Sequence, residues 1–430
     1  MTDNIINIRL IGNSIGSFYE DLLVKYQNNT YQFSWINPSK DIDKSWLVYG
    51  GTESQYPGRC IEEFLELHGK VITTAINKKP LQEFRVVAHA LPPSEIPWRY
   101  ALPKIDYATY IKSLIEEILG CLFPIWNNLE GEYYRTTYSQ TTKACGYFQP
   151  AKINVSYFSE QKNNFNNSLT SVFDSFKPNE EGFSRAPTYS KSKSRTGRLI
   201  TTSGANMLLL EKKHRSKILE SRFGKDGQII QLDYKSLEPR VLLGYLNKKE
   251  EAAQLDIYAD TAKKFSLTIP RGTVKDIVLS KLYGAGKEKI LSLLGENPEY
   301  VMNCINEHFS FREMTNMLQA QHDESGRKMI RNAYGRCIKT DDVQSRVFLN
   351  YFCQSSAVDV ALLGFHQILL YLEKYQLLSL IVPIFFLHDA VLLDVHKDAM
   401  PEISFLKIIG SQNIMKFEDI QFYLEDSNVT

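Results

Sequence analysis

Cysteine is scarce in this chain, with six copies among 430 residues. They stand apart at positions 60, 121, 145, 304, 337 and 353, and no Cys-x-x-Cys pair occurs. Disulfide-rich secreted domains and zinc fingers need closely spaced pairs, so both classes are excluded. We expect reduced thiols and a cytoplasmic protein.

Long apolar runs and a secretory start are missing as well. No stretch of about 18 apolar residues occurs, so we expect no membrane span and no membrane partner. The first residues, Met1-Thr2-Asp3-Asn4, provide neither the basic segment nor the apolar core of a signal peptide. Length and a hydrophobic content of 43% predict two or three globular domains.

Excess charge of either sign is absent, because the formal net charge is only +1. Basic residues are nevertheless concentrated between residues 185 and 222, which contain ten Lys or Arg against Glu211 and Glu220. Taken alone, such a run more often indicates a solvated, flexible loop. It also provides cations that could contact a phosphate backbone, so the neighbouring motifs must decide between the two interpretations.

Two changes of pattern predict the domain organisation. Residues 1–98 alternate apolar and polar positions in short runs, such as Ile6–Leu10 and Tyr31–Trp35, and include a helix-like segment at 61–68. We predict a small α+β domain that ends at the proline cluster of residues 91–97. From Tyr107 the apolar positions recur at steps of three and four, which predicts a long helix at the start of a helical region, 99–195.

Two aspartates stand where strands are predicted to end. Asp233 follows the apolar run 229–232, and Asp389 follows the apolar run 384–387 and His388. Carboxylates at strand ends can meet at one divalent-metal site even when they are far apart in sequence. Such a site is what phosphoryl or nucleotidyl transfer needs, whereas a lone aspartate is as often a helix cap or a turn residue.

Three further groups of residues accompany these aspartates in a definite order. The basic stretch contains Arg-Thr-Gly-Arg-Leu at residues 195–199, before Asp233. A helix is predicted to begin at Ile269-Pro270-Arg271, because proline is favoured in a first helical turn. One face of this helix carries Arg271, Lys275, Leu279 and Tyr283. A last polar series before His388 consists of Arg346, Asn350 and Gln354.

From about Thr196 to Val395 the chain resembles the family A DNA polymerases, the bacterial DNA polymerase I type also found in many phages. The family's block D-Y-S-Q-I-E-L-R is matched by Asp233, Tyr234, Glu238 and Arg240. Its helix block R-x3-K-x3-F-x3-Y-G is matched by Arg271, Lys275, Tyr283 and Gly284. Its H-D-E block is matched at the first two positions by His388 and Asp389, and Ala390 stands at the third.

The resemblance implies a right-hand polymerase of mixed α/β class in several domains. The thumb would lie at 99–195, and palm and fingers would lie at 196–430 with the fingers at roughly 250–340. Two Mg²⁺ ions, replaceable by Mn²⁺, would be held by Asp233, Asp389 and the backbone carbonyl of Tyr234. The implied partners are primer-template DNA and deoxynucleoside triphosphates. Residues 1–98, an accessory domain of unknown role, are a candidate docking site for a replication protein. The implied location is the cytoplasm of a bacterial or phage-infected cell.

Other roles are implied by the matching family positions. Glu238 is expected to exclude a ribose 2′ hydroxyl, and Tyr258 stands where the family often has a phosphate-binding histidine. Nucleotide binding is expected at Arg271, Lys275, Leu279, Tyr283, Glu238 and Tyr258. DNA contacts are expected at Arg198, Arg240, Arg346, Asn350, Gln354 and His388. Contacts in the minor groove test base-pair geometry without reading sequence, and the basic stretch becomes the predicted primer-template track.

Three departures from the family pattern bear on activity. Leu279 replaces the usual aromatic residue, which removes a stacking face worth about 1 kcal/mol. Ala390 replaces a secondary glutamate, so metal binding should survive while the full catalytic rate is in question. No aspartate occurs between residues 44 and 100, and the nearest candidate for a nuclease motif is Asp41-Ile42-Asp43, so we expect no proofreading exonuclease.

The expected function is DNA-directed DNA synthesis at a primer 3′ end by two-metal-ion nucleotidyl transfer. Two alternatives stay open. A single-subunit RNA polymerase shares the helix block and the His-Asp pair, although Glu238 argues against it. A catalytically weak primer-template-binding protein on a polymerase scaffold is suggested by Leu279 and Ala390.

Overall fold

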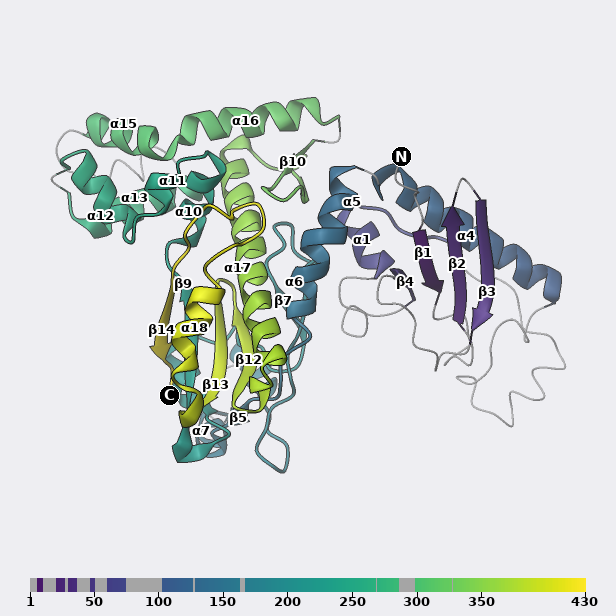
Figure 1. Cartoon of the computed structure of the whole chain (residues 1–430), viewed down its shortest axis with the longest axis horizontal. Helices are drawn as coiled ribbons and strands as arrows, with labels where there is room; N and C mark the ends of the chain where they lie inside the picture. The colour runs from purple at the N-terminus through teal and green to yellow at the C-terminus, as the bar shows by residue number, and fades with distance from the viewer. Residues whose placement is uncertain are drawn as a thin grey trace. The chain divides into compact units, whose positions relative to one another are not determined.

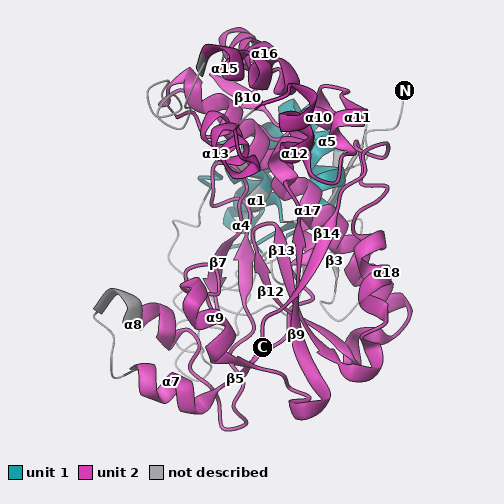
Figure 2. Cartoon of the chain, turned by 90° about the vertical axis from the view of Figure 1, so that its left-hand side faces the viewer, with its two compact units in different colours: residues 1–139 teal, residues 140–430 magenta. Residues whose placement is uncertain are grey.

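The computed structural model describes residues 6–10, 21–27, 30–36, 47–50, 60–74, 103–126, 128–162, 167–267, 269–285, 298–326 and 328–430. The chain forms two compact units, residues 1–139 and residues 140–430 (Figure 2). The proline cluster at 91–97 and the aspartates at 41 and 43 lie outside the described residues. The predicted domain boundaries at residues 98 and 195 stay predictions.

The first unit combines a four-stranded sheet with helices. Its strand order is β3-β2-β1-β4, in which only the pair β1 and β4 is parallel. The strands are β1 (Ile6–Leu10), β2 (Asp21–Gln27), β3 (Thr30–Ile36) and β4 (Leu47–Tyr49). The helices are α1 (Ile61–Leu67), α4 (Lys104–Trp126), α5 (Leu129–Tyr133) and the π-helix η2 (Tyr134–Tyr138). The predicted strands, the segment at 61–68 and the long helix are confirmed, since α4 buries a stripe that runs from Tyr107 to Ile125.

A four-stranded antiparallel sheet forms the centre of the second unit, with the order β12-β13-β9-β14 (Figure 1). These strands are β12 (Ile381–Leu387), β13 (Ala390–His396), β9 (Gly227–Tyr234) and β14 (Leu424–Asn428). β12 has seven residues that are all buried, and β13 has six of seven. Pro383 fits into β12 because this strand lies at the sheet edge and the register shifts at that point.

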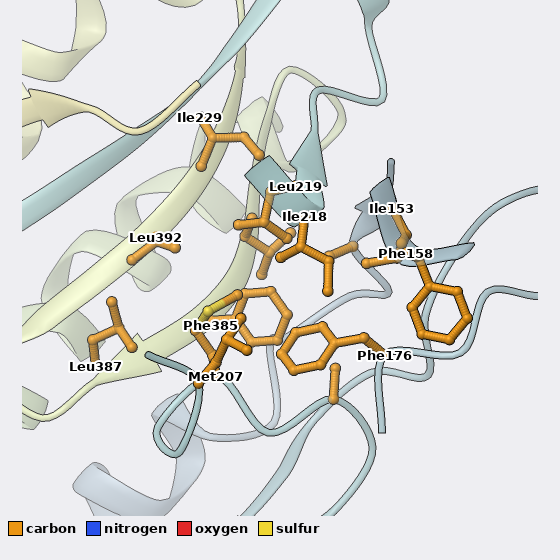
Figure 3. Packing of buried hydrophobic residues seen from close by; sticks show 14 of the residues in the cluster. Ile153, Phe158, Phe176, Met207, Ile218, Leu219, Ile229, Phe385, Leu387 and Leu392 are labelled. Atoms are coloured by element: carbon orange, nitrogen blue, oxygen red, sulfur yellow. The ribbon is translucent and has the colours of Figure 1, made fainter. Parts of the chain in front are cut away.

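One face of this sheet packs against the segment that precedes it in sequence. Alternate side chains such as Phe385 and Leu387 join a buried cluster with Phe176, Met207 and Ile218 (Figure 3). The elements of this layer are β5 (Lys152–Ile153), α7 (Val155–Lys162), α8 (Asn167–Asp174), α9 (Lys212–Ile218) and β8 (Leu219–Glu220). The same segment also contains a separate pair of strands, β6 (Thr188–Ser190) and β7 (Ile200–Ser203), and Tyr189 of β6 contacts Phe386 of β12. α6 (Ser139–Ala144) leads into it. The layer therefore anchors the basic stretch 185–222 to the sheet.

The other face packs against the long helix α17 (Phe348–Lys374), which runs beside β12 in Figure 1. Phe365 stacks on Phe386 and also contacts the ring of Tyr234. The helix can approach this closely because residue 364 is glycine. A Cβ at Gly364 would lie only 1.9 Å from the Tyr234 hydroxyl. That hydroxyl also donates a hydrogen bond to the Gly410 carbonyl, just after α18 (Glu402–Ile409).

Length and composition alone would let one helix of the described ranges, Ser345–Lys374, cross a membrane. In its most apolar window, 83% of the residues are buried inside the protein. The core helix of a globular protein meets the same test, so the burial explains its composition without a bilayer.

Helices dominate the chain between β9 and α17. They are α10 (Leu237–Tyr245), α11 (Lys249–Ala252), α12 (Ile257–Lys264), α13 (Arg271–Leu282), α15 (Pro298–Phe309) and α16 (Phe311–Glu324). A hairpin of β10 (Met329–Arg331) and β11 (Cys337–Lys339) follows. Figure 2 shows α13, α15 and α16 at one end of the second unit, opposite α7 and α8. The predicted mixed α/β class is confirmed.

Candidate active site

Asp233 and Asp389 lie close together, the first on strand β9 and the second in the turn just before β13. Asp233 is the seventh residue of β9 and pairs across the sheet with Ala390. Asp389 immediately precedes Ala390, in the two-residue turn that joins β12 to β13. The Tyr234 N–H donates a 3.1 Å hydrogen bond to the Asp389 carbonyl, which ties the turn to β9. The structure thus brings together two carboxylates that are 156 positions apart in sequence.

Their surroundings disfavour two negative charges. Burial raises the pKa of Asp233 to about 7, and the charge of Asp389 contributes in the same direction. Burial also raises the pKa of Asp389, although its side chain reaches the surface and Arg198 partly offsets the effect. Gln231 Nε2 donates to Asp233 Oδ2 at 3.3 Å. A divalent cation bound between these two carboxylates would stabilise their ionised forms, and carboxylate oxygens are ligands that such a cation prefers.

The part of the chain that the structure describes has no group of three or more His, Cys, Asp or Glu side chains arranged so that it could hold a metal ion. A metal site here would therefore rely on two carboxylates with backbone oxygens or water. Ala390, where the family has glutamate, is only 2% exposed and belongs to the buried apolar cluster. A third carboxylate at this position would have to be buried among apolar side chains.

A cavity of about 420 Å³ opens over the two aspartates. Lys212 and Arg215 of α9 line it together with Asp233 and Asp389. Lys212 lowers the pKa of Asp233, although burial outweighs this effect. Both cations belong to the basic stretch 185–222, but the motifs single out neither of them. Their three-residue spacing, which would place both cations on one side of a helix, is a sequence signal that could identify them.

Glu238 connects three elements beside the aspartates. Its Oε2 accepts a 2.8 Å hydrogen bond from the Tyr283 hydroxyl at the end of α13. Its Oε1 lies 3.8 Å from Nη2 of Arg198. Burial raises the pKa of Glu238, while Tyr283 and Arg198 oppose the shift. A second, small cavity of about 30 Å³ brings Arg198 and Glu238 together with Gln354, His388 and Asp389.

The face of α13 is arranged as its spacing predicts. Arg271 and Lys275 are exposed, Leu279 is half-buried and Tyr283 is 43% exposed. The opposite face buries Val274, Ile277, Val278 and Leu282. Arg271 Nε contacts Asp256 Oδ2 at 2.6 Å, whereas Lys275 has no ion-pair partner among the described residues. Lys275 is exposed on this face, where an anionic ligand could contact it.

Arg240 requires a correction, because the structure buries it completely. Its Nε donates to the Lys235 carbonyl at 3.0 Å, and its two terminal nitrogens donate to the carbonyls of Ala252 and Leu255. The guanidinium also lies 4.6 Å from the ring centroid of Tyr423. Arg240 joins β9, α10 and α11, and it does not reach a surface where DNA could bind.

Tyr258 also differs from the expected nucleotide contact. It is only 2% exposed, and Arg271 lies over its ring at 5.5 Å. An interaction with Ser236 lowers the pKa of its hydroxyl, but burial outweighs it and raises the pKa. The hydroxyl therefore faces the protein interior, and the ring supports Arg271 from below.

The remaining predicted residues lie at the start of α17. Arg346 is exposed, and its carbonyl approaches Gly284 so closely that a Cβ there would lie 2.6 Å from it. Gly284, with φ of +73°, thus allows the end of α13 to contact this turn. Asn350 Oδ1 is buried without a hydrogen-bond partner in the described part of the chain.

Comparisons with known proteins rest on structure alone. No protein-family model matches the sequence, and no curated protein matches it. The structure is similar to the POL domain of Pol1 from M. smegmatis, solved in complex with DNA primer-template and dNTP. The TM-score is 0.60 with 12% identity, and the match covers 98% of this chain and 95% of that chain. The chain thus has the mixed α/β fold of a polymerase domain.

Proposed function

We propose that this protein is a DNA-directed DNA polymerase of the family A type that extends a primer 3′ end with deoxynucleotides. The observation that carries the proposal is that Asp233 and Asp389 line one cavity together with Lys212 and Arg215. The polymerase-domain fold and the three motif blocks that resemble the family support it. The similar structure contains primer-template and dNTP, which are the partners we propose here.

Asp233 and Asp389 would hold divalent metal ions, with the carbonyl of Tyr234 as a further ligand. Bound Mg²⁺ would stabilise the charge that develops on the attacking and leaving oxygens of the nucleotidyl transfer. The chain's own cations would position the triphosphate, with Lys275 and Arg271 offered along one exposed face of α13. Arg271 would have to exchange Asp256 for phosphate, which the exposed position of the pair permits.

Glu238 would select the sugar. Its carboxylate is held between Tyr283 and Arg198, so it cannot swing away to admit a 2′ hydroxyl without losing both contacts. Gln354, His388 and Arg198, which line the same small cavity as Asp389, would contact the primer terminus and test its pairing. We also propose that the chain adds nucleotides without proofreading.

Primer extension on a defined template tests the proposal. We expect the purified protein to add deoxynucleotides with Mg²⁺ and to leave a mispaired primer end uncut. Asp389→Asn should abolish addition, whereas Asp419→Asn, which changes an exposed aspartate paired with Lys249, should not. Ribonucleotide incorporation at an equal rate would favour an RNA polymerase. Tight primer-template binding without any extension would favour a catalytically weak binding protein.

A further inference from the structure

Residues 190–198, which we call the strap, lead from β6 to Arg198. A tight turn closes the strap, since the Gly197 N–H donates to the Ser194 carbonyl at 3.1 Å and Ser194 Oγ donates to the Arg198 carbonyl at 2.7 Å. Gly197 has a φ of +76°, and a Cβ there would lie 3.0 Å from the guanidinium carbon of Arg336. The strap is therefore pressed against Arg336.

A ring of hydrogen bonds anchors the first part of the strap to α17. Lys191 is 2% exposed and its Nζ donates to Asp359 of α17, which is fully buried. Asn332 Nδ2 donates to the other oxygen of Asp359 at 2.7 Å, and Asn332 Oδ1 accepts from the Arg336 N–H at 2.9 Å. Arg336 Nη2 then donates to the carbonyls of Lys191 and Ser194, which closes the ring.

Arg195 anchors the last part of the strap to the segment that precedes α17. Its two terminal nitrogens donate to the two carboxylate oxygens of Asp342 at 2.8 and 2.6 Å, a bidentate pair. The guanidinium also lies 5.6 Å from the ring centroid of Tyr351 on α17. Two cations of the basic stretch 185–222, Lys191 and Arg195, are thus engaged by the protein's own carboxylates.

We propose that Lys191 and Arg195 are positioning residues for the proposed polymerase reaction, on which this inference rests. They attach the strap to α17 at both ends, so that Arg198 stays 3.8 Å from Glu238 and shares a cavity with Gln354 of the same helix. Their positive charges therefore hold Arg198 in register with the primer terminus. They do not form part of the track that contacts the DNA backbone.

The opposite assignment, in which Arg195 binds a phosphate, makes a contrary prediction for its partner. If Arg195 contacts DNA, then Asp342 competes with DNA for it, and Asp342→Asn should leave activity unchanged or strengthen binding. If Arg195 acts as an anchor, then Asp342→Asn removes the contact just as Arg195→Ala does. The pair is exposed at the surface, so either variant should fold normally.

The experiment is a double-mutant cycle on steady-state nucleotide addition and on primer-template binding. Arg195→Ala and Asp342→Asn should each lower kcat about tenfold, because a misaligned primer terminus reacts more slowly. The double variant should be no worse than either single variant. The Kd for primer-template and its dependence on salt should not change, whereas loss of a phosphate contact reduces the salt slope by about 1. Lys397→Ala, which breaks another exposed pair, with Asp226, is the matched control.

A second readout does not depend on catalysis. Backbone hydrogen exchange in residues 190–198 should become faster in Asp342→Asn than in the wild type. Three results would overturn the positioning role. These are an unchanged exchange rate in residues 190–198 of Asp342→Asn, losses of kcat that add up in the double variant, and tighter binding of primer-template by Asp342→Asn. If the wild type extends no primer, the proposed function fails by itself, while the exchange measurement still decides whether the strap is anchored as described.

Discussion

The Tyr283 hydroxyl donates a 2.8 Å hydrogen bond to Glu238 Oε2 and so joins the end of α13 to the start of α10. Burial raises the pKa of Tyr283, and the neighbouring carboxylate of Glu238 raises it further, so the phenol stays a donor at neutral pH. The bond restricts both side chains at the place where an incoming sugar would lie. Sugar selection should therefore depend on the pair of residues.

We expect Glu238→Ala to increase ribonucleotide incorporation relative to deoxynucleotide incorporation by roughly tenfold or more, because the side chain that blocks the 2′ hydroxyl is removed. Tyr283→Phe should give a smaller increase, since the carboxylate remains but is no longer held. Competition between the two nucleotide types at a single template position measures the ratio. Equal selectivity in Glu238→Ala and wild type would remove Glu238 from this role.

Asp233→Asn is expected to reduce single-nucleotide addition by about 1,000-fold or more, because a proposed metal ligand is lost. Without metal the same change should stabilise the fold by about 1 kcal/mol, since it relieves repulsion from Asp389 and the cost of burying a charge. Thermal unfolding with and without Mg²⁺ tests this. The assignment fails if Mg²⁺ raises the Tm of Asp233→Asn as much as it raises that of the wild type.

His308 should make the protein sensitive to acid. It is 2% exposed, and neither ring nitrogen has a hydrogen-bond partner among the described residues. Burial, with a smaller contribution from Lys264, lowers its pKa from 6.5 to about 4. Between these two pH values the unfolded chain binds the proton and the folded protein does not. The contribution of His308 to the free energy of unfolding therefore falls by up to about 3 kcal/mol as the pH drops from 6.5 to 4.

Replacing the imidazole by an apolar ring removes this dependence. His308→Phe should lose less stability than the wild type between pH 6.5 and 4, as measured by urea unfolding at a series of pH values. At pH 7.5 and above, the imidazole is neutral in both the folded and the unfolded state. Its titration should therefore not affect the difference in unfolding free energy between His308→Phe and the wild type. Parallel stability curves for the two proteins across the acid range would contradict the expectation.

Arg240→Met should destabilise the protein by about 2 to 3 kcal/mol, because three backbone carbonyls lose their donor in a buried position. Arg240→Lys should be nearly as damaging, since one ammonium group cannot span carbonyls on residues 235, 252 and 255. The salt dependence of primer-template binding should stay as in the wild type. A reduced salt slope in Arg240→Met would instead indicate a DNA contact.

Local pattern was sufficient to predict the elements that carry the site. The apolar run before Asp233 and the proline before Arg271 correctly predicted where β9 ends and where α13 begins. Such signals depend on residues a few positions apart, so they can be read directly from the sequence. The motif blocks added their order along the chain, which placed the two aspartates in one sheet.

Local sequence pattern does not predict which way a side chain points or which residues far apart in sequence form pairs. Arg240 matches a family position, but the letter does not show that its side chain turns inward towards three carbonyls. Lys191 and Asp359 are 168 positions apart, so nothing in the local pattern connects them. The sequence pattern shows the basic stretch only as one charged surface. In the fold, Lys212 and Arg215 line the cavity, whereas Lys191 and Arg195 pair with carboxylates of the protein itself.

Gly364 sets how closely α17 packs against β9 in the second unit. Since a hydrogen atom alone fits between α17 and the Tyr234 hydroxyl, the sizes of the residues at these two positions are coupled. Homologues with a large aromatic residue at 234 should keep glycine at 364, and those with a smaller residue at 234 should be free to vary there. This pair offers a covariation signature by which remote relatives could be recognised even where the motif letters have drifted.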